Sequence, residues 1–303
     1  MTPKIKMDMN INFTTCPLDK SKFYDGANGN KIAIFFNNAR YMLKFPPKVK
    51  PSKNLAMTHT NACFCEYMAC HIVKSLGLRV QETILGTYLD KVVVACQDFT
   101  SDTELFVDFI AVKNSILALE SGGKDTTLSG VLLAIEQQSI VDRTALKAHF
   151  WEMFIADTLI GNFDRHNGNW GFIKDLSTHH YSIAPIFDCG SSLFSQSDAT
   201  HMQQALEDKQ EMRARVYSYP CSMLKDDKDK KINYHNFLTT TQNKDCLSAL
   251  VKLAPKMDMA QIHSIIDNTP FISRLHKDFL KAVLQQRKEK IIDKAYVRAL
   301  ILI

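Results

Sequence analysis

The stretch from Gly161 to Phe172 reads GNFDRHNGNWGF and, together with FDCG at residues 187–190, decides the fold. Within it Asp164 and Asn169 stand five residues apart, and Asp188 follows in a second turn that contains glycine. Oxygen-bearing side chains at this spacing suit a hard cation that keeps waters and substrate phosphates among its ligands. A polar turn after a helix would also explain Asp164 and Asn169, but it would not explain Asp188 behind an apolar strand.

This spacing is typical of a kinase active site. In a kinase catalytic loop one Asp accepts the proton of the attacking hydroxyl, and an Asn five residues later reaches a magnesium ion. A second Asp, from the following loop, holds metal against the triphosphate. The pattern therefore predicts a kinase site on Asp164, Asn169 and Asp188. We interpret His166 as a hydrogen-bonding residue that fixes the loop, and Arg165 as a cation that anchors it.

Length and composition allow such an enzyme. The chain has 303 residues, 46% of them hydrophobic, which is enough to bury large cores in two lobes. A net charge of +5 is too mild to indicate nucleic acid or an anionic membrane as partner. No apolar run reaches transmembrane length, and the N-terminus lacks the apolar core of a signal peptide. The eight cysteines form no Cys-x-x-Cys pair, so we expect reduced, intracellular thiols.

Residues 1–99 are predicted to form a small β-rich lobe. Two apolar, aromatic-rich runs between Lys31 and Phe45 indicate a hairpin. Ahead of them, Gly26 and Gly29 would let backbone N–H groups approach a phosphate, although an ordinary hairpin turn explains these glycines equally well. Lys44 ends the second strand, where a kinase places its α/β-phosphate lysine; the alternative is a strand-end lysine exposed to water.

A helix is predicted from about Thr60 to Leu76, with Glu66 off its apolar stripe. We expect Glu66 to turn towards Lys44 and orient it, although glutamates on helix surfaces are common. Strands over residues 79–88 and 91–96 come next. They lead into Gln97-Asp98-Phe99, a hinge whose backbone could bind adenine.

Residues 100–303 are predicted to form a helical lobe. We expect helices over residues 104–120, 128–138, 144–160, 199–209, 245–253 and 271–300. A short hairpin over residues 170–173 and 181–186 carries the chain from the Asp164 loop to Asp188. The charge-dense segment from Lys225 to Lys231 is most simply a solvated loop.

These motifs resemble the signature of HipA-type serine/threonine kinases, bacterial toxin kinases with a divergent protein-kinase fold. The resemblance rests on GNFDRH-x-x-NWG from Gly161 to Gly171 and on P-x-FD-x-G-x-SL from Pro185 to Leu193. It extends upstream through Lys44 and the helix that bears Glu66. It implies an α+β, two-lobed, protein-kinase-like fold with a β-rich N-lobe and a helical C-lobe.

The resemblance also implies the chemistry of the site. Asp164 would be the catalytic base, Asn169 and Asp188 the magnesium ligands, and Lys44 the phosphate-binding lysine. Glu66 would orient that lysine. The substrates would be ATP with Mg²⁺ and a protein bearing a serine or threonine hydroxyl, with autophosphorylation expected. At the hinge, Gln97 and Phe99 would flank the adenine.

The chain also departs from that family. HipA toxins are typically longer, with an N-terminal subdomain used for the antitoxin and operator complex, so DNA-linked repression is not expected here. The glycine loop is not the usual family string, and Cys189 replaces the Phe of ordinary kinases. Two alternatives stay open at this point: a kinase of small molecules such as aminoglycosides or lipids, and a pseudokinase that holds nucleotide without transfer. We expect a bacterial cytoplasmic protein, but an effector secreted without a signal peptide, with host protein targets, would look the same.

Overall fold

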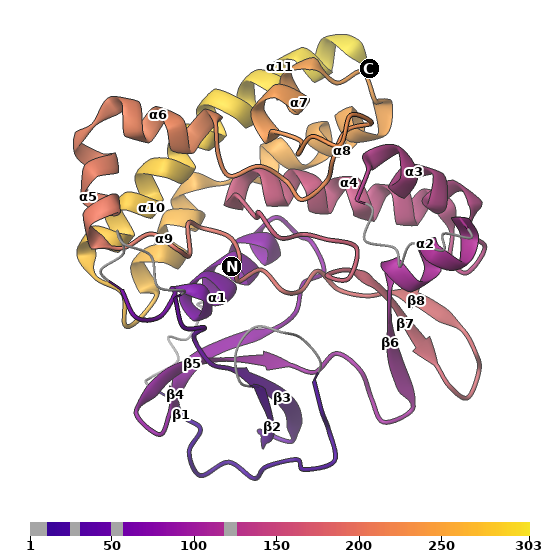
Figure 1. Cartoon of the computed structure of the whole chain (residues 1–303), viewed down its shortest axis with the longest axis vertical. Coiled ribbons are helices and arrows are strands. Elements are labelled where there is room, and N and C mark those ends of the chain that lie inside the picture. Colours follow the sequence, from indigo (N-terminus) through magenta and orange to yellow (C-terminus); the bar gives the residue numbers. More distant parts are fainter. Residues whose placement is uncertain (1–10, 25–30, 50–56, 118–125) are drawn as a thin grey trace, which may run out of the picture.

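The computed structural model describes residues 11–24, 31–49, 57–117 and 126–303 (Figure 1). Strands gather at the N-terminal end of the chain and helices at the C-terminal end, as Figure 1 shows from indigo to yellow. The predicted α+β class is therefore confirmed. Gly26 and Gly29 lie outside the described residues.

A five-stranded sheet forms the N-terminal layer, in the order β1-β4-β5-β3-β2. Its strands are β1 (Ile11–Asn12), β2 (Lys31–Phe36), β3 (Ala39–Lys44), β4 (Thr83–Tyr88) and β5 (Lys91–Gln97). β2 and β3 form the predicted hairpin, and Asn37 and Asn38 between them have φ values of 47° and 61°. Two left-handed residues in a two-residue loop match the twist of the flanking strands. The register places Lys44 opposite Val94 of β5, in the interior of the sheet.

Helix α1 (Ala62–Ser75) lies between this sheet and the helices (Figure 1). It contacts β4 and β5 on one side and α9 (Met259–Asn268) on the other. Cys63 packs with the sheet residues, whereas Cys65 and Cys70 belong to the main helical core. All three thiols are buried, as expected, and none of them forms a disulfide. Because its residues belong to both clusters, α1 joins the two parts of the core.

A second sheet consists of β6 (Glu104–Asp108), β7 (Gly171–Asp175) and β8 (Tyr181–Ile183). The predicted helix over residues 104–120 is wrong in its first part, because residues 104–108 pair with β7 and the helix α2 (Phe109–Leu117) begins after them; residues 118–120 lie outside the described residues. A Cβ atom on Gly171 would lie 2.3 Å from the Val107 carbonyl oxygen, so this glycine permits the close pairing. Long-range pairing here overrides the local pattern.

Helix α4 (Arg143–Ile160) is the buried centre of the helical part. Its first turn is capped by Asp142, which accepts a hydrogen bond from the Ala145 N–H at 2.7 Å. Gly161, with φ 67°, ends it in the left-handed conformation that favours glycine. The helix thus delivers the chain directly into the Asp164 loop.

The remaining helices pack against α4 or against one another. They are α3 (Leu128–Gln137), α5 (Ala199–Glu207), α6 (Lys209–Tyr217), α7 (Tyr234–Thr240), α8 (Lys244–Leu253), α10 (Arg274–Arg287) and α11 (Asp293–Leu302). The long helix expected over residues 271–300 is interrupted by a π-helical turn at Lys288–Ile292. Helices α6, α7 and α9 were not predicted. No helix among the described residues has the length and apolar character needed to span a membrane.

Candidate active site

Lys44 lies between two carboxylates. Its Nζ is 2.9 Å from Glu66 Oε2 and 2.8 Å from Asp188 Oδ1, so three elements distant in sequence meet at one cation. The contact with Glu66 is the one expected from the sequence. Burial alone would lower the pKa of Lys44, but Asp188 and Glu66 outweigh it and raise that pKa well above its ordinary value. Lys44 is therefore charged at any working pH.

The turn that carries Asp188 is fixed by the same glutamate. Glu66, only 2% exposed, accepts a hydrogen bond from the Cys189 N–H at 2.8 Å through its Oε1. A Cβ atom on Gly190 would lie 3.0 Å from Glu66 Oε2, so the close approach favours glycine there. Asp188 itself has φ 55°, in the left-handed region. The adjacent Lys44 lowers the pKa of Asp188 to about 2, which keeps this carboxylate ionised.

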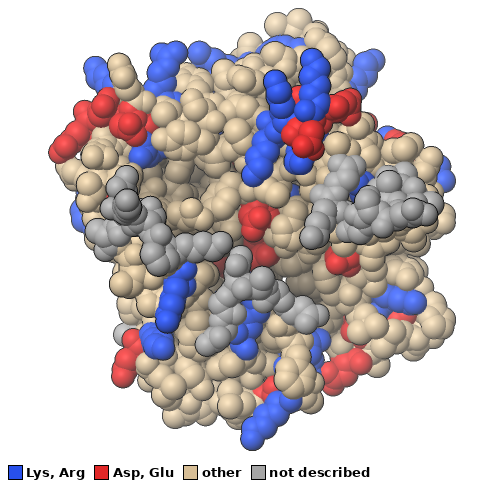
Figure 2. Space-filling model, in the orientation of Figure 1, with Lys and Arg blue, Asp and Glu red and all other residues tan. Residues whose placement is uncertain are grey.

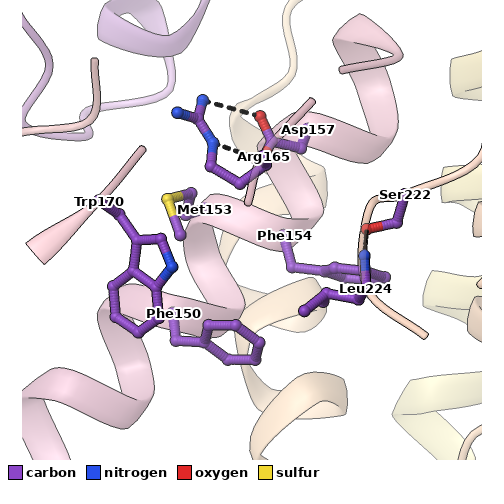
Figure 3. A pocket seen from close by; sticks show the side chains of 8 residues that line it. All are labelled: Phe150, Met153, Phe154, Asp157, Arg165, Trp170, Ser222 and Leu224. Carbon is purple, nitrogen blue, oxygen red and sulfur yellow. Dashed lines mark hydrogen bonds and ion pairs between the residues drawn. The ribbon is translucent and has the colours of Figure 1, made fainter. Parts of the chain in front are cut away.

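Arg165 anchors the Asp164 loop beneath its surface. Its Nε donates to Asp157 Oδ2 at 2.9 Å and its Nη2 to Asp157 Oδ1 at 3.2 Å, and Figure 3 shows the two side chains pointing at each other from the loop and α4. Its Nη1 donates to the carbonyls of Asn169, at 3.0 Å, and Phe187. One buried guanidinium thus joins α4, the loop and the Asp188 turn, as a loop-anchoring cation would.

The loop residues position one another through short hydrogen bonds. The Asn169 Nδ2 donates to the Asp164 carbonyl at 2.9 Å, and the Asp164 N–H donates to Asn162 Oδ1 at 3.0 Å. His166 Nδ1 accepts from the Gly168 N–H at 3.0 Å, which is the structural role predicted for this histidine. Burial raises the pKa of Asp164, and the negative charge of Asp188 raises it further.

Acidic side chains lie in a hollow near the middle of the face shown in Figure 2, between the sheet and the helices. Within the described ranges no three His, Cys, Asp or Glu side chains form a ready-made metal site. One carboxylate, Asp188, and one amide, Asn169, are the available pair. Mg²⁺ is commonly held by one or two protein oxygens plus substrate phosphates and waters, so this sparse donor set fits it.

The predicted hinge is ordered by backbone and aromatic contacts. The Gln97 N–H donates to the Glu82 carbonyl at 2.9 Å, and the Gln97 carbonyl accepts from Gln81 Nε2 at 2.9 Å. The Phe99 ring lies 5.9 Å from that of Phe106 on β6 and 5.4 Å from that of Phe187. Because Phe187 immediately precedes Asp188, the hinge and the Asp188 turn share one aromatic cluster.

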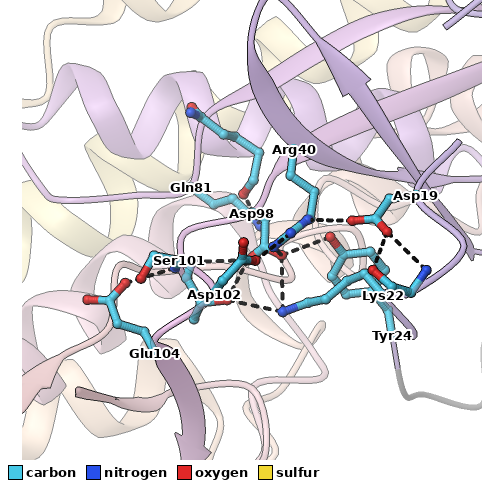
Figure 4. Close-up of polar contacts among 12 residues, drawn as sticks. Asp19, Lys22, Tyr24, Arg40, Gln81, Asp98, Ser101, Asp102 and Glu104 are labelled. Carbon is cyan, nitrogen blue, oxygen red and sulfur yellow. Dashed lines mark hydrogen bonds and ion pairs between the residues drawn. The ribbon is translucent and has the colours of Figure 1, made fainter. Parts of the chain in front are cut away.

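A polar cluster beside the hinge was not predicted (Figure 4). Asp98 Oδ2 accepts from the Tyr24 hydroxyl at 2.9 Å and lies 3.3 Å from Lys22 Nζ. Arg40 bridges Asp19 and Asp102 alongside, at 2.8 and 2.6 Å. Burial alone would raise the pKa of Asp98, but hydrogen bonds from its neighbours outweigh burial and lower that pKa. The cluster fastens the segment that precedes the glycine-containing stretch to the hinge.

Two further site residues were missed from the sequence. Asp157 and Asn162 support Arg165 and Asp164 from within the core, with Asn162 Nδ2 donating to Asp157 Oδ1 at 3.1 Å. A signal for Asp157 was available, because it is the one carboxylate in the apolar helix segment MFIADTLI at residues 153–160. A buried charge in such a helix is expected to have a partner.

Comparison with known proteins identifies the family. The family model described as HipA-like C-terminal domain matches residues 25–267. The chain belongs to the HipA-like family. It is 57% identical over 290 residues to the serine/threonine-protein kinase CtkA of Helicobacter pylori strain J99, a match that covers 96% of this chain and 89% of that protein. The chain is accordingly a serine/threonine protein kinase, and the resemblance inferred from the motifs is confirmed.

Solved structures agree with this assignment. The crystal structure of the Helicobacter pylori proinflammatory kinase CtkA superposes with a TM-score of 0.93 at 56% identity, covering 97% of this chain and 99% of that one. HipA from the Shewanella oneidensis complex with HipB and operator DNA superposes with a TM-score of 0.56 at 14% identity, covering 92% and 70%. The second likeness shows the fold alone. The predicted protein-kinase-like fold is confirmed.

Proposed function

We propose that this kinase transfers the γ-phosphate of ATP, with Mg²⁺, to a serine or threonine hydroxyl of a protein, including its own chain. The observation that carries the proposal is the ion-paired Lys44, held between Glu66 and Asp188. A lysine paired with a glutamate of a helix, next to an aspartate that can hold metal, is the arrangement an active protein kinase requires. A pseudokinase, which holds nucleotide without transferring phosphate, would not need Lys44, Glu66 and Asp188 together.

Lys44 would bind the ATP phosphates, and Asp188 and Asn169 would hold Mg²⁺. When bound, the metal ion neutralises charge on the phosphates. Glu66 would hold Lys44 in the site independently of its contact with Asp188. The low pKa of Asp188 keeps its carboxylate available as a ligand.

Asp164 would accept or orient the proton of the attacking hydroxyl. Its carboxylate is half-buried on a loop fixed from below by Arg165, so it is positioned before the substrate arrives. Its raised pKa makes it a better proton acceptor than an ordinary aspartate. Positioning and electrostatics supply most of the catalysis in phosphoryl transfer.

We assign residues 1–99 to the N-lobe and residues 100–303 to the C-lobe, with the hinge at their junction. Gln97 and Phe99 would flank the adenine. Gly26 and Gly29 would approach the phosphates through their backbone N–H groups. The edge-on contact of Phe99 with Phe106 and its tilted contact with Phe187 support a rigid floor for the base.

We further propose that the protein substrates include proteins of a host cell. The Helicobacter pylori relative is called a proinflammatory kinase, and this relationship supports host proteins as substrates of this chain. Such a role requires that the protein leaves the bacterial cell.

Incubation with radiolabelled ATP tests the proposal. The purified chain is incubated first alone and then with a generic protein, with and without Mg²⁺, beside the Asp164→Asn variant. Labelled protein that depends on Mg²⁺ and on Asp164 supports the proposal. Label found only in a small-molecule acceptor, such as an aminoglycoside or a lipid, would replace it with the small-molecule kinase alternative.

A further inference from the structure

A cavity of about 310 Å³ opens beside the Asp164 loop. We propose that it binds a bulky, uncharged side chain of the protein substrate, a few residues from the hydroxyl that is phosphorylated. The proposal rests on the function proposed above for Asp164. Its volume is at the lower end of the range of about 300–1,000 Å³ typical of ligand sites. Its lining residues include Phe163, Phe194, Ser197, His201, Arg215 and Tyr219.

The cavity adjoins the catalytic loop through the backbone. Phe163, in its wall, immediately precedes Asp164, and consecutive Cα atoms are about 3.8 Å apart. The Phe163 N–H donates to the Ser191 carbonyl at 3.0 Å, and the Leu193 N–H donates to the Ile160 carbonyl at 2.8 Å. These bonds hold the segment that follows Asp188 against the start of the loop. A peptide with its hydroxyl at Asp164 would therefore pass the cavity within a few residues.

Aromatic surface dominates the walls. Phe194 has φ 54° and the preceding Leu193 has φ 49°, an uncommon pair of left-handed residues without glycine. The Phe194 ring packs on Phe279, with centroids 5.6 Å apart, yet it still lines the cavity. Tyr219 remains 43% exposed. Covering such rings with an apolar side chain removes their surface from water, which favours binding.

The polar side chains Arg215 and His201 in the cavity wall already have acidic partners. Arg215 Nη1 lies 2.6 Å from Glu211 Oε2, and His201 Nδ1 lies 2.6 Å from Asp198 Oδ1. An acidic side chain would compete with the carboxylates for Arg215 or His201, and a basic one would meet Arg215. An uncharged side chain leaves both pairs intact. The charge arrangement therefore favours a neutral occupant.

Arg215 is fixed in the cavity wall. The residue is 4% exposed. Its carbonyl accepts from Arg287 Nη1 at 3.1 Å, which fixes this end of α6. The wall that Arg215 contributes is therefore in place before a substrate binds.

A positional peptide library tests the inference. Each pool has a central serine or threonine, one fixed flanking residue and mixed residues elsewhere, and is labelled with radioactive ATP. At one flanking position we expect Phe, Tyr, Leu and Met to exceed Ala, Asp and Lys by about tenfold in kcat/KM, the effect of burying one large side chain. Equal labelling of all pools, or selection of Asp or Lys, would overturn the inference while leaving the kinase function intact. Failure to label any peptide or protein would instead overturn the proposed function.

Two variants connect the preference to the cavity. Tyr219→Ala removes a wall and Ser197→Leu fills the space, and either change should flatten the preference while ATP affinity stays the same. Leu206→Ala is the matched control, because Leu206 is an exposed apolar residue on α5 that does not line the cavity. A preference that survives both cavity variants, or that is lost equally in Leu206→Ala, would refute the assignment.

Discussion

The buried pair of Arg165 and Asp157 gives the sharpest stability prediction. Their side chains are 5% and 3% exposed, and two hydrogen bonds join them. Asp157→Asn keeps the size of the side chain but leaves the guanidinium without its counter-charge. Removing one partner of a buried ion pair costs about 3–5 kcal/mol in the free energy of unfolding. We expect a loss of that size in this variant.

That loss converts into a measurable melting temperature. Globular proteins have an unfolding entropy of about 2.1 cal/mol/K per residue, which gives about 0.64 kcal/mol/K for 303 residues. The expected decrease in Tm is therefore about 5–8 °C by scanning calorimetry. Asp278→Asn is the control, since the Arg274–Asp278 pair is solvent-exposed and should give a far smaller change.

Activity should fall together with stability. Arg165 also donates to the carbonyls of Asn169 and Phe187, so an altered guanidinium would misplace Asn169 and the Asp188 turn, which we propose as the metal ligands. We therefore expect a lower kcat in Asp157→Asn even at temperatures where the protein is fully folded. If Asp157→Asn has the same Tm as Asp278→Asn and a normal kcat, the loop-anchoring role of Arg165 is refuted.

Three other predictions concern single groups. Lys44→Ala should weaken ATP binding and also lower Tm, because Glu66 is buried and loses its cation; adding Glu66→Gln should restore Tm but not ATP affinity. Asp188→Asn should keep the fold, but the Mg²⁺ dependence of ATP turnover should be lost together with the charged ligand. ATP turnover that responds to Mg²⁺ as in the wild type would contradict the role of Asp188 as a metal ligand. Burial lowers the pKa of His276 from 6.5 to about 4, so the unfolded state binds more protons between these values and stability must fall as pH drops through them. In urea titrations His276→Gln should lose about 2 kcal/mol less than wild type between pH 7 and pH 5, and equal losses would exclude this origin.

Much of the fold followed from local sequence signals. The hairpin ending at Lys44 and helix α4 were readable because apolar periodicity and turn residues agree there. Strand β6 was not readable, because its pairing partner β7 lies more than 60 residues away and the segment continues directly into α2. Helix α6 was missed because its residues KQEMRARVY have almost no apolar stripe.

The candidate site likewise contains residues that local sequence signals indicate and residues that they do not. The residues that touch ligand in a kinase occur at fixed spacings, so the chain alone predicts roles for Asp164, Asn169 and Asp188, and those roles stay predictions. Residues that support them through tertiary contacts could not. The Asp98 cluster joins side chains from three separate segments, and the cavity beside Phe163 depends on how α6 packs against the loop. Only the three-dimensional arrangement brings such groups together.

The central claim is that Asp164 acts in transfer and not in binding. Asp164→Asn is nearly isosteric, and the bonds that shape the loop use the backbone N–H and carbonyl of residue 164, not its side chain. ATP with Mg²⁺ should therefore still bind through Lys44, Asn169 and Asp188. Removing a positioned general base typically costs about two to four powers of ten in rate.

Measuring ATP affinity by calorimetry beside the phosphotransfer rate of the same Asp164→Asn sample tests this claim most directly. We predict near-normal affinity with a rate at least about a hundredfold below that of the wild type. A variant that keeps more than about a tenth of the wild-type rate would show that Asp164 is not the base. A variant that loses ATP binding would show that Asp164 belongs to the binding site instead.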